Sequence, residues 1–125
     1  MIRVLHFDYE PYTALGCVQM LEHRLKKYHS VDYMFLKTDI KSFEGSRKRI
    51  EELLPEKDVL LIHPGVEEQK AVTEYPSKFP HLKIAFLVPM PDDYHEKDGK
   101  IEAFGWGNLD AIIDFILSAE KSGGN

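Results

Sequence analysis

Three side chains with the potential for chemistry follow two apolar segments of the chain. Asp8 and Glu10 come after the run "VLHF" (4–7), and His63 comes after the run "VLLI" (59–62). In an open parallel sheet, ligands bind and reactions occur at the carboxyl ends of the strands. If the two segments are neighbouring strands, two carboxylates and an imidazole therefore meet at one edge of the sheet.

These three side chains are compatible with several kinds of site. They could form a polar cluster that caps the loops and the first helix, or a site for a small ligand or an anion. Carboxylates and imidazoles also bind transition metals, although the spacing of Asp8, Glu10 and His63 does not demand a metal. His63 could accept phosphate as a nucleophile, but the sequence identifies no base or cation beside it. We therefore treat the three as candidate ligand-binding residues and weaker candidate metal ligands, and expect no catalytic residue and no cofactor.

Other polar or reactive positions have simpler interpretations. The turn "GWGN" (105–108) precedes a helix, and its backbone amides could hold an anion, which makes Gly105 and Gly107 candidate ligand-binding residues. A tight turn from strand to helix would favour glycine in any case. His6 lies within the first apolar segment and is expected to be a buried, hydrogen-bonded ring. Cys17 is expected to be a small core residue.

Short apolar runs alternate with helical patterns along the chain. This alternation is typical of a parallel sheet covered by helices on both faces. Proline ends two of the predicted helices, before Pro76 in one case and at Pro55 in the other, and Asn108 is a good N-cap for the last helix. We predict strands over 2–7, 31–36, 58–63, 82–88 and 101–104, and helices over 12–28, 43–54, 66–74 and from 109 onward.

Five strands in about 120 residues favour the flavodoxin-like order 2-1-3-4-5. In this order the first and third strands are neighbours, which would bring Asp8 and Glu10 beside His63. We therefore predict one three-layer α/β domain over residues 1–120, with a five-stranded, mainly parallel sheet, and a flexible tail over 121–125.

The segment "VLHFDYEP" (4–11) resembles the opening of the receiver domains of two-component response regulators. In that family an apolar strand ends in adjacent acidic residues, often followed by Glu-Pro. Asp8 matches the first acidic position, Tyr9 stands where the second acid would be, and Glu10 with Pro11 continues the pattern. The resemblance extends in element order from residue 1 to about residue 120.

The departures from the receiver pattern affect phosphorylation. His63 stands where receivers carry the phosphoacceptor aspartate, Val88 stands at the usual Ser or Thr, and Gly105 or Trp106 stands at the usual lysine. Receivers use carboxylates to hold a divalent cation, and cations to neutralise the transferring phosphoryl group. The resemblance thus implies a pseudo-receiver that acts through protein contacts in signalling or regulation. The alternative is a small enzyme, or a ligand- or metal-binding protein, that uses the polar cluster defined above.

The segment "PMPDDYHEKDGK" (89–100) is too short and too rich in proline for an ordinary helix with two connections. We therefore expect the fourth helix of a receiver to be missing or reduced to about one turn. The pair "DG" (98–99) could instead turn the chain back and make 101–104 an antiparallel strand. We favour the parallel arrangement, because 105–108 leads into the last helix as a βα turn should.

Loss of the fourth helix would uncover apolar side chains of the fourth and fifth strands. A monomer rarely leaves a large apolar patch in water. We therefore expect a protein partner, and specifically a homodimer formed on the side of these two strands. The candidate aromatic anchors of this interface are Phe86, Phe104 and Trp106.

The composition restricts the class of protein. Of the 125 residues, 43% are hydrophobic and 30% are charged, as in a folded globular protein. The net charge of −5 argues against a nucleic-acid partner. The single cysteine excludes an internal disulfide, and no apolar run is long enough for a membrane span or a signal peptide. We expect a cytoplasmic protein without a membrane partner.

Overall fold

The computed structural model describes residues 1–8, 12–37, 43–62, 74–88 and 101–123. The strands are β1 (Ile2–Asp8), β2 (Val31–Lys37), β3 (Val59–Ile62), β4 (Lys83–Val88) and β5 (Glu102–Gly105). The helices are α1 (Tyr12–Leu25), α2 (Phe43–Leu53), α4 (Tyr75–Lys78), α5 (Leu109–Gly123) and the short 3₁₀ helix η2 (Leu54–Glu56).

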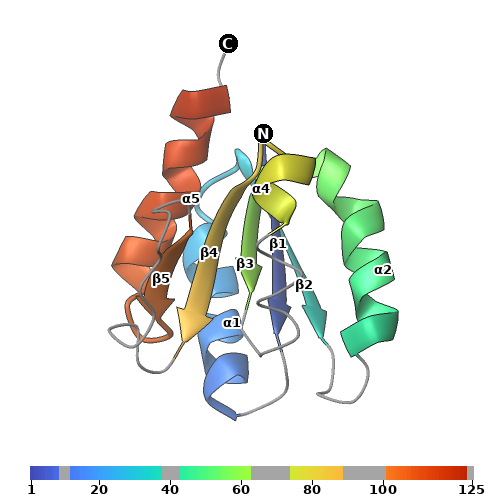
Figure 1. Cartoon of the computed structure of the whole chain (residues 1–125). Coiled ribbons are helices and arrows are strands. Elements are labelled where there is room, and N and C mark those ends of the chain that lie inside the picture. Colours follow the sequence, from blue (N-terminus) through green and yellow to red (C-terminus); the bar gives the residue numbers. More distant parts are fainter. Residues whose placement is uncertain (9–11, 38–42, 63–73, 89–100, 124–125) are drawn as a thin grey trace.

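The five strands form one sheet in the order β2-β1-β3-β4-β5, and all its pairs are parallel (Figure 1). The predicted strand order is therefore confirmed. The parallel direction of β5 is confirmed as well, since Phe104 lies opposite Leu87 of β4 in a parallel register. This order leaves β2 and β5 as the two edge strands.

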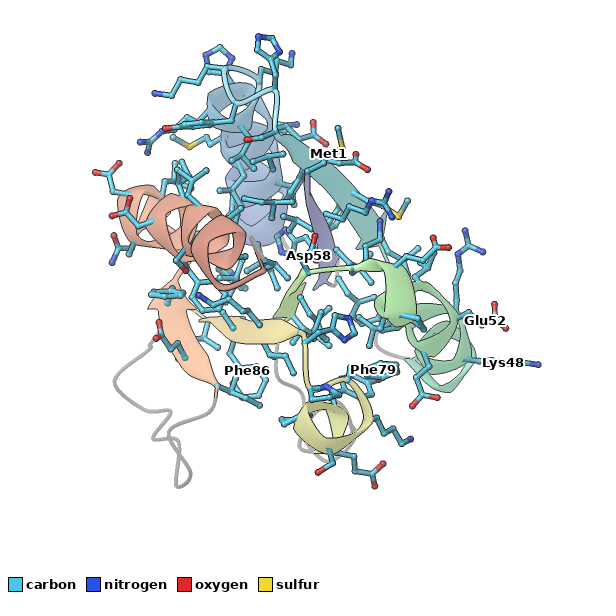
Figure 2. The ribbon with its side chains drawn as sticks, turned by 90° about the horizontal axis from the view of Figure 1, so that it is seen from above. Met1, Lys48, Glu52, Asp58, Phe79 and Phe86 are labelled. Atoms are coloured by element: carbon cyan, nitrogen blue, oxygen red, sulfur yellow. The ribbon has the colours of Figure 1, made fainter. Side chains whose placement is uncertain are left out.

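One face of the sheet is covered by α1 and α5, and the other by α2 and α4 (Figure 2). Side chains alternate across a strand, so neighbouring residues of β1 belong to different cores. Val4 packs in the core beneath α1 and α5, whereas Leu5 packs in the core beneath α2 and α4. The central strand β3 is buried throughout, as its unbroken apolar run predicts.

The core beneath α1 and α5 explains the sequences of these two helices. Leu21 and Leu25 of α1 are buried, whereas Met20 is 57% exposed, so the apolar stripe of α1 runs through Leu21. Cys17 is buried in the same core, as expected. From α5 the core receives Leu109, Ile112, Ile113, Phe115, Ile116 and Ala119.

The beginning of α5 agrees with the sequence. The helix starts at Leu109, directly after Asn108, and the N–H of Ile112 donates to the carbonyl of Asn108 at 3.2 Å. An ion pair then joins α5 to α1, because Arg24 Nη2 lies 2.5 Å from Asp110 Oδ1. Arg24 is near the end of α1 and Asp110 is in the first turn of α5, so the pair links two helices on one face of the sheet.

Some predicted helix ends are wrong. The first helix ends at Leu25, earlier than the predicted Tyr28. A separate helical turn, α4, which the sequence did not predict, begins at Tyr75 and includes Pro76. Proline is tolerated in the first turn because the N–H groups there have no partner within the helix. The rest of the predicted helix 66–74, up to residue 73, lies outside the described residues, as does the segment 89–100 and with it the prediction of a reduced fourth helix.

No helix in the described parts of the chain is both long enough and apolar enough to cross a membrane.

Removal of core volume from α5 should reduce stability strongly. Ile112 is fully buried beneath the sheet. We expect Ile112→Ala to lower the free energy of unfolding by about 2–5 kcal/mol, because it removes buried apolar surface and leaves a cavity. The exposed Asp114 of the same helix offers a control, and Asp114→Ala should change stability by no more than about 0.5 kcal/mol. Urea unfolding of both variants would measure this, and equal effects would contradict the assignment of the core.

Candidate functional site

The carboxyl ends of β1 and β3 lie side by side. Phe7 of β1 is opposite Ile62, the last residue of β3, and Asp8 is the last residue of β1. The structure thus confirms that the strands preceding the predicted polar cluster are neighbours. Glu10, His63 and the side chain of Asp8 lie outside the described residues, so their meeting at one site stays a prediction.

The turn between β5 and α5 is held by backbone hydrogen bonds. The N–H of Trp106 donates to the carbonyl of Val88 at 3.3 Å, and the N–H of Asn108 donates to the carbonyl of Gly105 at 3.0 Å. A Cβ atom at Gly107 would meet nothing within 4 Å, and its φ is not in the left-handed region. The backbone conformation therefore does not require glycine at position 107, contrary to the expectation from the sequence. Anion binding by this turn stays a prediction.

The side chain of His6 on β1 is buried and contacts the edge strand β2. Its ring is 0% exposed, and Nδ1 is hydrogen-bonded to the hydroxyl of Tyr33 at 2.5 Å, with the donor set by the histidine tautomer. The ring also makes edge contacts with Tyr33 and Phe35, at centroid distances of 5.9 and 5.2 Å. The prediction of a buried, hydrogen-bonded histidine is confirmed.

A groove lies beside the ring of Tyr33, between the end of α1 and β2. Its volume is about 240 Å³. The five lining residues come from both elements: Glu22, Leu25, Lys26, Val31 and Tyr33. The sequence did not predict this groove, because it depends on how the last turns of α1 cross over the edge of the sheet. A tyrosine at an inward position of an edge strand was the one signal that could have indicated it.

The end of α1 next to the groove carries many basic side chains. Lys26, Lys27, His23 and His29 are exposed there. Lys27 Nζ lies 5.2 Å from the centroid of the Tyr28 ring. Positive side chains at the C-terminus of a helix are favoured by its dipole, so part of this charge stabilises α1 itself.

The three candidate interface residues lie in different environments. Phe86 is 1% exposed and belongs to the core beneath α2 and α4. Phe104 and Trp106 are partly buried and pack against the other core, where the Phe104 and Phe115 rings are 5.5 Å apart between centroids. Of the three, only Phe104 and Trp106 have surface that another chain could contact.

A metal site cannot be built from the side chains that the structure describes. Within residues 1–8, 12–37, 43–62, 74–88 and 101–123, no three His, Cys, Asp or Glu side chains gather so that they could hold an ion. This finding does not include Glu10, His63 or the side chain of Asp8, which lie outside the described residues. The weaker alternative that these three residues hold a metal is therefore untested.

Solved structures with the same fold cover almost the whole chain. A fragment of a proposed lipoprotein from Peptoclostridium difficile 630 is 16% identical, with a TM-score of 0.65 over 98% of this chain and 99% of that one. A type II dehydroquinase from Butyrivibrio crossotus DSM 2876 is 15% identical, with a TM-score of 0.63 over 95% and 97% of the two chains. The lysine decarboxylase LdcF from Francisella novicida is 16% identical, with a TM-score of 0.55 over 93% of this chain and 17% of its own.

At these identities the likeness shows the fold alone, and the same fold carries different functions in the three proteins. No family model and no curated protein matches the sequence.

The hydrogen bond between His6 and Tyr33 should contribute measurably to stability. Tyr33→Phe keeps the ring but removes the hydroxyl that is bonded to the buried imidazole. We expect it to lower the free energy of unfolding by about 1–2 kcal/mol. Tyr28→Phe is the matched control, since the Tyr28 hydroxyl bonds to no other described residue, and we expect a change of at most about 0.5 kcal/mol. Equal unfolding midpoints in urea for the two variants would show that the bond contributes nothing.

Proposed function

We propose that this protein is a receiver-like domain that takes no phosphoryl group on an aspartate and acts through contacts with other proteins in signalling or regulation. The observation that carries the proposal is the adjacent position of β1 and β3 in a parallel sheet of order β2-β1-β3-β4-β5. In this order β3 ends beside β1, at the edge where open parallel sheets bind ligands, and we propose that the next residue of the chain lies at this edge. The residue at this position in the sequence is His63.

The residue types at the edge of the sheet do not suit aspartyl phosphorylation. An acyl phosphate needs a carboxylate acceptor, and the position that matches the receiver acceptor is histidine. Val88 ends β4 and Gly105 ends β5, so neither the hydroxyl nor the ammonium group of a receiver is present at the ends of these strands. A chain with these replacements keeps the receiver architecture without the groups that stabilise a transferring phosphoryl.

The side of the sheet at β5 is our proposed contact surface. β5 is a short edge strand, so among the described residues no strand pairs with one side of its backbone. Phe104 of β5 and Trp106 just after it are partly exposed aromatic residues. Aromatic residues of this kind are often the main contributors to binding energy in interfaces. We propose that a second copy of the chain covers this side in an isologous dimer.

Phosphodonor treatment tests the proposal. We expect no phosphate on a carboxylate of the protein after incubation with acetyl phosphate and magnesium, because the acceptor position holds an imidazole. Intact-mass spectrometry, with a phosphorylatable receiver domain in the same reaction as the positive control, would measure this. A gain of one phosphate that hydroxylamine removes would contradict the proposal. The alternative is a small enzyme, or a ligand- or metal-binding protein, that uses Asp8, Glu10 and His63. It would be favoured if the wild type bound a metal or small ligand and the Asp8→Asn and His63→Gln variants bound it more weakly.

Sedimentation equilibrium tests the dimer. We expect the wild type to self-associate below about 100 µM, and Trp106→Glu to weaken association because a charge replaces an aromatic anchor. Met20→Glu is the control, since Met20 is an exposed apolar residue on α1, away from β5. A wild type that stays monomeric at this concentration would contradict the dimer. A dimer that is unaffected by Trp106→Glu and Phe104→Glu would place the interface elsewhere.

A further inference from the structure

We propose that the outer edge of β2 and the groove beside it bind an extended acidic peptide, which joins the sheet as a sixth strand next to β2. This surface is at the opposite end of the sheet from β5. The binding mode is strand addition, in which backbone hydrogen bonds hold the peptide and a pocket selects its side chains. The proposal goes beyond the dimer and does not depend on it.

The direction of the backbone groups in β2 follows from its pairing with β1. The N–H of Ile2 donates to the carbonyl of Ser30 at 2.6 Å, and Ile2 lies opposite Val31. In a parallel ladder this register directs the backbone groups of every second residue towards the neighbour. Asp32 and the alternate residues after it therefore bond to β1.

The intervening residues of β2 direct their backbone groups to the outer edge. The hydrogen bond of Val31 agrees with this, because its N–H donates to the carbonyl of Tyr28 at 3.1 Å rather than to β1. Backbone groups of alternate residues point to the same side of a strand, so those of Tyr33 and Phe35 point outward like those of Val31. No strand of the described chain pairs with this edge, so the N–H and C=O groups of Tyr33 and Phe35 face the side where a peptide would add.

The groove lies next to these outward groups. Strands in a sheet are about 4.8 Å apart, so alternate side chains of an added strand would point over the groove between α1 and β2. Leu25 and Val31 contribute apolar surface to the groove, and Tyr33 contributes an aromatic ring held by the buried His6. Its volume of about 240 Å³ therefore suits an apolar side chain of the peptide.

Charge selects an acidic peptide. Residues 22–31, "EHRLKKYHSV", contain one acid against three Lys or Arg and two His, in a chain with a net charge of −5. Lys26 and Glu22 both line the groove, and Arg24 is already paired with Asp110, so the positive charge that a peptide would meet comes from Lys26 and from Lys27 beside it. Figure 2 shows nitrogen-bearing side chains gathered around the end of α1, on the side of the sheet away from α2 and α4. Carboxylates beside the apolar anchor would meet this positive charge.

A second copy of the chain is a poorer occupant of this edge. In an antiparallel pairing of two β2 strands centred on Met34, Lys37 of one copy would come opposite Val31 of the other. That arrangement brings a lysine to the end of β2 where Lys26 lines the groove. Like charges at this position oppose the pairing, whereas an acidic peptide would be attracted.

The experiment selects peptides from a displayed library of random linear sequences of about ten residues, with the folded 125-residue chain as the target. We expect selected peptides rich in Asp and Glu, with an apolar or aromatic anchor. In ¹⁵N NMR titrations their binding should shift the amide signals of Tyr33 and Phe35. The amides of the bound peptide form two alternating sets, and only one set would donate hydrogen bonds to β2. N-methylation of that set should abolish binding, and N-methylation of the other set should leave binding unchanged.

Charge variants give the second readout. Lys26→Glu should weaken binding of a selected acidic peptide by about three- to tenfold in fluorescence anisotropy, because it reverses a charge in the groove. Lys48→Glu is the matched control. Lys48 is exposed on α2, on the other face of the sheet from α1, and points outward in Figure 2, so binding should be unchanged.

Any of the following results would overturn the proposal. A selection that enriches no peptide would exclude strand addition. Selected peptides would exclude it as well if they shifted the amide signals of residues outside β2 and α1. The same holds if they still bound after N-methylation of either alternating set of their amides. Self-association of the wild type that is lost in Lys26→Glu would assign the edge to a second copy. The last result concerns nucleic acid. If an oligonucleotide bound the wild type and bound Lys26→Glu more weakly, while acidic peptides did not bind, the basic end of α1 would be a nucleic-acid site.

Discussion

The parallel pairing of β1 with β3 is the contact on which the rest of the structure depends. It joins residues more than fifty positions apart, with Val4 opposite Val59 and Phe7 opposite Ile62. β1 is also paired along its whole length with β2, so it has strands on both sides. Because the chain enters β1 first and then places β2 and β3 on opposite sides of it, the connecting helices α1 and α2 lie on opposite faces. The two separate cores follow from this arrangement.

The same pairing determines where a partner could bind. It places the carboxyl ends of β1 and β3 together, where related architectures hold ligands, and it makes β2 and β5 the edges of the sheet. At the ends of the strands, this chain has residues that do not suit phosphoryl transfer. At the edges, it has partly exposed aromatic residues near β5 and a groove with basic surroundings at β2. Our two proposals therefore concern the two edges of the sheet, a second copy of the chain at β5 and a peptide at β2.

The fold could be predicted from the sequence because its apolar pattern is simple. The run "VLLI" is apolar at every position, which is typical of a strand buried on both faces of a sheet. The alternation of such runs with helical segments then favours crossovers and parallel strands. Asn108 indicated the first residue of α5, because a helix start depends on local capping.

Features that depend on packing between distant elements were not predictable from local pattern. The groove at β2 arises where Leu25 and Lys26 approach Tyr33, which is a tertiary contact with no local signature. Phe86 was expected to be an interface residue, but the helices on its side of the sheet contribute to a core that buries it. The sequence did not predict the short helix α4, in which Pro76 occupies the first turn, where proline is allowed. Residue composition alone could not predict these features, because each depends on which other side chains surround one residue in the folded chain.

Hydrogen–deuterium exchange at two protein concentrations tests most directly whether the sheet edges are the interaction surfaces. The protein would be labelled at about 1 µM and at about 100 µM, and the exchange rates of the strands compared. We expect slower exchange in β5 at the higher concentration, because the dimer covers this strand, and no change in β2 until a peptide is added. The assignment of β5 to the dimer would be contradicted if its exchange rate did not depend on protein concentration. The assignment of β2 to a peptide would be contradicted if β2 became protected without any peptide.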